Sequence, residues 1–155
     1  MPGYLLDTNH ITAWELQNPR LMEHFREAPP ENIIWVCPIS LGELECGFRI
    51  TNDAQPERRR ACREFIEQKV LDFVWEIGIT TRDSYAQIMD QIWRQHPSAG
   101  RGVETQQHLS ALGVDVNDVW IAAVAMERNL ILLTNDRMQT IRECVPEIRV
   151  ENWLE

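Results

Sequence analysis

Two apolar stretches that each run into acidic or polar residues decide the fold: Tyr4-Leu5-Leu6-Asp7 and Leu130-Ile131-Leu132-Leu133-Thr134-Asn135-Asp136. Both apolar runs are short and uninterrupted, which is typical of strands buried on both faces of a parallel sheet. Comparable runs occur at 33–37, 73–75 and 148–150. We therefore expect a strand in each of these segments.

Helical patterns separate the expected strands. Apolar residues recur at helical spacing over 54–73, 80–95 and 117–128, with a shorter pattern near 104–112 and a loop at 97–102. Thr80 and Asp83 resemble a capping box that opens the second of these helices. Alternating strands and helices predict an α/β fold, a three-layer sandwich around a mainly parallel central sheet. A chain of 155 residues fits one domain, which we expect to cover 1–155.

Composition narrows the class of protein. The chain is 44% hydrophobic and 25% charged, which is ordinary for a soluble globule. It shows neither an apolar stretch that spans a bilayer nor a signal-like N-terminus, so we expect a cytoplasmic protein without a membrane partner. Cysteines form no C-x-x-C pair, which argues against a thiolate zinc site and favours reduced, mostly buried thiols. They are Cys37, Cys46, Cys62 and Cys144.

Acidic residues follow the expected strands at corresponding points. Asp7 comes directly after the first strand, and Asp136 lies just beyond the strand that ends at Leu133. Glu43 is expected in the first turn of the helix after the second strand, and Asp118 at the start of the helix that leads back to Leu130. Ligands of open parallel sheets bind beyond the carboxyl ends of the strands, so these acids should meet at one edge. Thr8, Asn9, Ser40, Asn117, Thr134 and Asn135 would bring short polar groups to the same edge.

Carboxylates that lie close together repel one another, so their negative charge must be neutralised by protons, cationic side chains or metal ions. Two unit charges about 4 Å apart repel by roughly 4 kcal/mol at an effective dielectric near 20. Among cations, only Arg137 is adjacent in sequence. Hard oxygen ligands without sulfur or imidazole select Mg²⁺ or Mn²⁺. With 24 acids against 15 bases, the chain has a net charge of −9, which argues against nonspecific binding of nucleic acid. Bound metal ions would nevertheless let it act on a nucleic-acid substrate.

Each acid also has a purely structural interpretation. Asp7 and Asp118 could cap their helices, and Asp136 could open a turn. Ser40 with Glu43 fits the S-x-x-E pattern of a capping box. Asp83 and Asp115 could reach the same edge, so spacing alone does not select the set of acids.

Four strings, in order, resemble the PIN-domain ribonucleases. Leu6-Asp7-Thr8-Asn9 is similar to their opening L-D-T-N, and residues 40–47 to their S-x-x-E-L-x-x-G segment. Residues 117–125, Asn-Asp-Val-Trp-Ile-Ala-Ala-Val-Ala, resemble their N-D-x-W-I-A-A-x-A helix, and Thr134-Asn135-Asp136 their T-x-D. The match runs from residue 4 to about 153. It looks most like the VapC type, the ribonuclease toxins of bacterial and archaeal toxin–antitoxin pairs.

The resemblance implies hydrolysis of RNA phosphodiester bonds with Mg²⁺, for which Mn²⁺ substitutes. It implies that Asp7, Glu43, Asp118 and Asp136 form the catalytic and metal-binding set, and that the protein has a cognate antitoxin and forms a homodimer. Thr8, Asn9, Thr134 and Arg137 are candidates for positioning water or the substrate phosphate. One departure is that Arg137, Met138 and Gln139 follow Asp136, where many relatives carry another acid followed by Phe.

Other functions remain open from the sequence. The chain could be a non-catalytic PIN-fold module that binds RNA or protein, or a nuclease directed at DNA. A haloacid-dehalogenase-like phosphatase is disfavoured because Asn9 stands where its D-x-D motif needs the second acid. The basic run Arg58-Arg59-Arg60 with Arg63 is expected to form a solvated helix face with i,i+4 pairs to Glu64 and Glu67, the alternative being contact with RNA.

Overall fold

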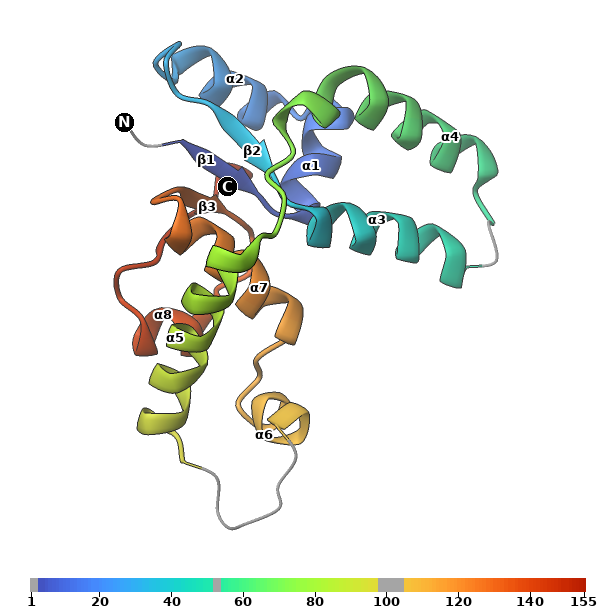
Figure 1. Ribbon diagram of the computed structural model, residues 1–155. Helices are drawn as coiled ribbons and strands as arrows, with labels where there is room; N and C mark the ends of the chain where they lie inside the picture. Colours follow the sequence, from blue (N-terminus) through green and yellow to red (C-terminus); the bar gives the residue numbers. More distant parts are fainter. Residues whose placement is uncertain (1–2, 52–53, 98–104) are drawn as a thin grey trace.

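A parallel sheet lies at the centre of the computed structural model, which describes residues 3–51, 54–97 and 105–155 (Figure 1). Its strands run in the order β2-β1-β3-β4, and every neighbouring pair is parallel. The strands are β1 (Tyr4–Leu6), β2 (Ile34–Val36), β3 (Ile131–Leu133) and β4 (Arg149–Glu151). The predicted α/β class and parallel sheet are therefore confirmed.

The expected strand at 73–75 is wrong. Only one bridge forms there, between Val74 and Val36, and the Trp75 amide donates to the Val36 carbonyl at 2.7 Å. The preceding residues, Leu71–Phe73, form a turn of 3-10 helix. The chain therefore becomes extended too late to pair along the length of β2, although its apolar residues are those of a strand.

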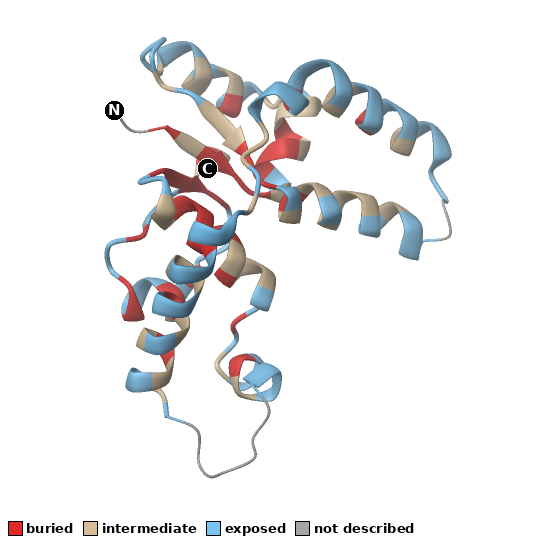
Figure 2. Cartoon of the chain, in the orientation of Figure 1, coloured by how far each residue is buried: buried red, intermediate tan, exposed pale blue. Residues whose placement is uncertain are grey.

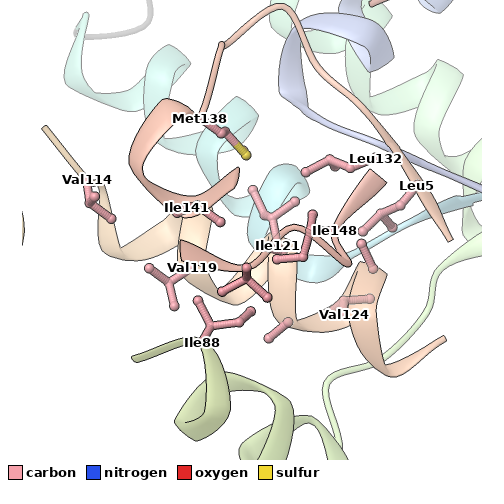
Figure 3. Close-up of a cluster of buried hydrophobic side chains, with 14 of the residues drawn as sticks. Leu5, Ile88, Val114, Val119, Ile121, Val124, Leu132, Met138, Ile141 and Ile148 are labelled. Carbon is pink, nitrogen blue, oxygen red and sulfur yellow. The ribbon is translucent and has the colours of Figure 1, made fainter. Parts of the chain in front are cut away.

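Both faces of the sheet are covered. Successive side chains of a strand point to opposite faces, so Leu5 and Leu6 enter different cores. Leu5 packs with Leu132 among residues of α5 (Ile79–Gln95), α7 (Val116–Glu127) and α8 (Gln139–Cys144) (Figure 3). Leu6 packs with Leu133 against α1 (Thr8–Glu15) and α2 (Pro19–Glu27). Figure 2 shows the resulting buried centre, and the predicted three-layer sandwich is confirmed.

The remaining helices extend from this centre. Figure 1 shows α3 (Pro38–Ile50) and α4 (Pro56–Phe65) running together away from the sheet, with α6 (Thr105–Ala111) near the other end of the molecule. The helix expected over 54–73 is divided, because α4 is followed by a π-helical turn, Ile66–Val70, before the 3-10 turn. The loop predicted at 97–102 lies almost wholly outside the described residues.

The capping box predicted from Thr80 and Asp83 is wrong. The helix begins one residue earlier, and the Thr81 hydroxyl accepts a hydrogen bond from the Gly78 amide at 3.1 Å. Thr80 instead donates its hydroxyl to Glu127 of α7. Thr80 therefore makes a tertiary hydrogen bond to another helix instead of the local cap that the sequence predicted.

Three of the four arginines in the basic cluster on α4 pair with acids of other helices, and Arg60 is exposed, as predicted. Arg58 pairs with Glu15 of α1, whose side chain is only 8% exposed. Arg59 and Arg63 both pair with Glu45 of α3, Arg63 at 2.9 Å. These arginines therefore fasten α4 to its neighbouring helices.

All four cysteines are free thiols, as predicted, and all except Cys46 are buried. Burial raises the pKa of Cys37 and Cys144, and raises that of Cys62 to about 11. Among the described residues, none of the helices is by itself long and apolar enough to cross a membrane; α6 and α7 meet that test only as a pair, bent by 88°.

Candidate functional site

Asp7 lies at the carboxyl end of β1 and is almost completely buried. Its Oδ1 accepts a hydrogen bond from the Thr8 amide at 2.6 Å, so the predicted helix cap is real. Its Oδ2 accepts from the Thr134 hydroxyl at 2.7 Å. The same hydroxyl oxygen accepts from the Asp136 amide at 3.0 Å. Thr134 thereby connects the ends of β1 and β3 at the edge where both acids were expected.

Glu43 joins three helices. Its Oε2 accepts from the Thr8 hydroxyl of α1 at 2.5 Å, and its Oε1 accepts from the Asn117 amide group of α7 at 3.0 Å. The prediction of a first-turn position was wrong: α3 starts at Pro38, so Glu43 lies in the second turn. Ser40 and Glu43 therefore form no capping box, and the Ser40 hydroxyl lies 3.6 Å from the Cys37 thiol.

Asp118 is the electrostatic centre of the site. Asp115, not Asp118, caps α7: its side chain accepts a hydrogen bond from the backbone N–H of Asn117 at 2.7 Å. Asp118 lies in the first turn of α7 and is partly buried. Burial, followed by the negative charges of its neighbours, raises the pKa of Asp118 to about 7. Those neighbours are, in decreasing effect, Asp136, Asp7, Asp115 and Glu43.

Asp136 is exposed in the loop between β3 and α8. Its Oδ1 accepts from the Met138 amide at 2.9 Å, so the predicted turn is also real. Met138 has a left-handed backbone, with φ of 43°, and its side chain is buried (Figure 3). Asn9 of α1 contacts this loop by donating to Asn135 at 2.7 Å. The loop that carries Asp136 is thus fixed by the hydrogen bond between Asn9 and Asn135 and by the burial of the Met138 side chain.

We call Asp7, Glu43, Asp118 and Asp136 the acidic rim. Charge interactions reach Asp118 from the other three, so these acids share one neighbourhood. Within the described residues, however, no three His, Cys, Asp or Glu side chains form a ready metal site. The donor chemistry still suits a hard dication, because each rim residue offers carboxylate oxygens, and each such oxygen can accept more than one bond.

Two residues near the rim were absent from the predicted site set. Asn117 binds Glu43, and Asp115 adds to the negative field at Asp118. The sequence had placed Asn117 at this edge and had left Asp115 able to reach it, but it assigned neither a role in the site. Asp83, which spacing alone had left possible, is 72% exposed and pairs with Arg82 at 3.0 Å. Arg137 is exposed and lines a cavity together with Asp118 and Asp136.

Comparisons with known proteins identify the family and the fold of the chain. The family model for the PIN domain matches residues 4–142. No curated protein matches the chain. Solved structures with the same fold include DNA-bound VapBC from Salmonella typhimurium, at 24% identity and a TM-score of 0.69, with 99% of each chain covered.

Two further solved structures have similar coverage. VapBC-1 from nontypeable Haemophilus influenzae is 20% identical with a TM-score of 0.68, and 98% of each chain is covered. VapBC-5 from Mycobacterium tuberculosis, of the VapBC family of toxin–antitoxin systems, is 20% identical with a TM-score of 0.58, covering 97% of this chain and 99% of that one. These similarities concern the fold. Since the family model matches most of the sequence, the chain belongs to the PIN domain family.

Proposed function

We propose that this protein is a metal-dependent endoribonuclease that acts as the VapC-type toxin of a type II toxin–antitoxin pair. The observation that carries the proposal is the acidic rim: a partly buried Asp118 in the field of acids from separate segments, at the carboxyl edge of a parallel sheet. Membership of the PIN family supports a hydrolase, because PIN domains are typically nucleases. The VapBC neighbours support the toxin assignment.

Asp7 and Asp118 would hold the principal Mg²⁺ or Mn²⁺, with Glu43 and Asp136 contributing directly or through water. A bound dication would supply charge neutralisation at the scissile phosphate and a more acidic water. The chain's own residues set the geometry. The Thr134 hydroxyl orients Asp7, and Thr8 with Asn117 fixes both oxygens of Glu43.

The remaining predicted residues would act on the substrate side. Thr8, Asn9 and Thr134 lie at the edge that carries the rim, and Thr8 and Thr134 already bind rim carboxylates. Arg137 has an exposed guanidinium next to Asp136, which suits a phosphate fork. Each would orient water or the substrate phosphate once the rim charge is neutralised.

An antitoxin and a second copy of the chain are the proposed protein partners. The structure of VapBC-5, a member of the VapBC family of toxin–antitoxin systems, supports the first, and the VapC resemblance implies the second. Co-expression with the product of a neighbouring short reading frame tests the antitoxin, and light scattering of the purified chain tests the dimer.

The test of the proposed activity is cleavage of RNA by Asp7→Asn and Asp118→Asn variants. Each change removes a charge from the rim with little change in shape, so cleavage should fall by about a hundredfold or more. Asp83→Asn is the matched control, because Asp83 is highly exposed and outside the rim. Circular dichroism checks that the variants fold. Undiminished, metal-dependent cleavage by either rim variant would contradict the assignment.

The alternative functions give different outcomes in the same assay. A non-catalytic module would bind RNA or protein without any cleavage that EDTA abolishes. A nuclease directed at DNA would cut single-stranded DNA in preference to RNA of the same sequence. The rim favours catalysis over binding alone, because a module that only binds phosphate has no use for crowded acids.

A further inference from the structure

A channel leads from the acidic rim along α8. A cavity of about 260 Å³ is lined by Asp118, Asp136, Arg137 and Gln139, among others. A larger one, of about 700 Å³, is lined by Arg137, Gln139, Arg142, Glu143, Pro146 and Ile148. Arg137 and Gln139 line both cavities, so the two adjoin at these residues. We call them together the α8 channel.

The channel contains cations that the fold does not use. Most described arginines form an ion pair with a carboxylate. Arg49, Arg59 and Arg63 pair with Glu45, and the other pairs are Arg58–Glu15, Arg82–Asp83, Arg94–Asp90 and Arg128–Glu127.

Arg137 and Arg142 differ from this set. Within the described ranges, neither guanidinium makes a hydrogen bond or an ion pair. Both side chains are exposed, and both line the same cavity. Among the other cations in the described part of the chain, Arg20, Arg60 and Lys69 have no side-chain partner either, but they do not line the channel.

The acid that lines the larger cavity is Glu143, and it already has a partner. Glu143 Oε1 accepts a hydrogen bond from the Gln139 amide group at 2.8 Å, so one of its oxygens is turned toward α8 itself. In the larger cavity, two cations against one acid leave a positive excess, whereas the smaller cavity carries the rim acids Asp118 and Asp136. A guanidinium binds phosphate through two parallel hydrogen bonds. The adjoining Pro146 is exposed and offers apolar surface on which a sugar or base can rest.

We propose that the α8 channel binds the RNA strand beside the cut, with Arg142 holding a backbone phosphate away from the scissile one. This rests on the proposed nuclease function and adds the path of the strand. A phosphate at the rim lies beside Asp136, and the strand then passes Arg137 before it reaches Arg142. The unengaged arginines counteract, along this path, the repulsion that the acidic protein exerts on RNA.

The test compares Arg142→Ala with Arg20→Ala, which removes an equally unengaged, exposed arginine from α2. In steady-state cleavage of a short single-stranded RNA, Arg142→Ala should raise KM about tenfold and leave kcat within about twofold, as expected when binding away from the reacting atoms is lost. The slope of log affinity against log salt should become shallower by about 0.7. Arg142→Lys should recover part of the affinity, and Arg20→Ala should behave like the wild type.

Substrate length gives an independent readout. If Arg142 holds a phosphate beyond the cut, its removal should matter only for RNAs extended on one side, and the shortest cleavable RNA should be insensitive. A loss that is the same at every length would overturn the proposal, and so would an Arg142→Ala variant that matches Arg20→Ala in KM. Loss of antitoxin binding with unchanged RNA affinity would also overturn it, because the channel would then serve a protein.

The nuclease proposal and the channel proposal can fail separately. Fluorescence anisotropy with labelled RNA and Mg²⁺ measures binding without requiring cleavage. Binding that depends on Arg142 without any cleavage contradicts the nuclease function alone. Cleavage that is indifferent to Arg142 contradicts the channel alone.

Discussion

At the scale of the residue, Asp118 has the most unusual environment in the acidic rim. It is partly buried, and the negative charges of Asp136, Asp7, Asp115 and Glu43 surround it. Its ordinary pKa of 3.8 rises to about 7 because burial and these charges both oppose ionisation. This environment favours the protonated form of Asp118 in the metal-free protein.

This shift predicts how the metal-free protein responds to pH. The folded state holds the Asp118 proton more tightly than the unfolded state does, so this proton stabilises the fold fully below pH 3.8, and the stabilisation is lost as pH rises through about 7. Asp118→Asn lacks this titration. Its melting temperature relative to the wild type should therefore rise steadily from pH 5 to pH 8 in EDTA, by several degrees in total.

Differential scanning fluorimetry at each pH makes the measurement. Asp83→Asn, which removes a highly exposed acid of α5, should follow the wild-type curve throughout. Because the two proteins differ in sequence only at residue 118, the difference between their curves reports this substitution. Parallel curves for Asp118→Asn and the wild type would show that Asp118 ionises normally in the folded protein.

At the scale of the element, α4 is attached by arginines rather than by a large apolar face. Arg58 makes a two-pronged contact with Glu15 of α1, in which the Arg58 Nη2 donates to Glu15 Oε2 at 2.6 Å. Arg59 and Arg63 share Glu45 of α3, and together with Arg49 they lower the pKa of Glu45 to about 2, with Arg59 having the largest effect. The position of α4 therefore depends on where α1 and α3 place their acids.

Replacing Arg58 by Ala should lower the free energy of unfolding by about 2–4 kcal/mol, because Glu15 would remain buried without its partner. Arg60→Ala, on the exposed side of the same helix, should change it by less than about 0.5 kcal/mol. Urea denaturation measures both. If the two variants unfold at the same urea concentration, the Arg58–Glu15 pair does not stabilise the protein.

Sequence periodicity predicted the elements that are locally determined. The apolar runs gave β1, β2, β3 and β4 within one residue at each end, and the helical patterns gave α5 and α7 equally well. The predictions of side-chain contacts failed where the actual partner is distant in the sequence. Thr80 was assigned to a local cap, but it binds Glu127, 47 residues away. The α4 arginines were matched with acids on their own helix, although Glu15 and Glu45 lie on others.

The candidate site was predictable to the same extent. Residues that follow parallel strands lie at the same edge of the sheet, so Asp7 and Asp136 could be assigned to one edge from the sequence alone. The Thr134 hydroxyl that connects them could not, because its bond to Asp7 spans 127 residues. Which acids hold metal remains a prediction from the sequence and the resemblance, as do the single domain over 1–155 and the cytoplasmic location.

At the scale of the whole molecule, the fold concentrates negative charge at one edge of the sheet. The net charge of −9 already opposes compaction, and the acidic rim adds local repulsion to it. Cations that bind only the folded rim must therefore stabilise the entire protein by mass action.

Manganese should raise the melting temperature of the wild type. At a concentration about one hundred times the dissociation constant, the stabilisation is about 2.7 kcal/mol, which is roughly 5–10 °C for a chain of this size. The shift should shrink in Asp7→Asn and Asp118→Asn and persist in Asp83→Asn. An unchanged melting temperature at saturating Mn²⁺ would contradict a metal site at the rim.

Cys46 gives this protein a built-in attachment point for a spectroscopic label. It is the exposed member of the four cysteines, and burial raises the pKa of each of the other three, so a maleimide dye should modify it selectively in the native sequence. Cys46 also lines a surface hollow of about 420 Å³ together with Glu43 and Asn117. A fluorophore there would sit one helical turn from the rim and would report, in real time and without mutagenesis, the arrival of whatever occupies it.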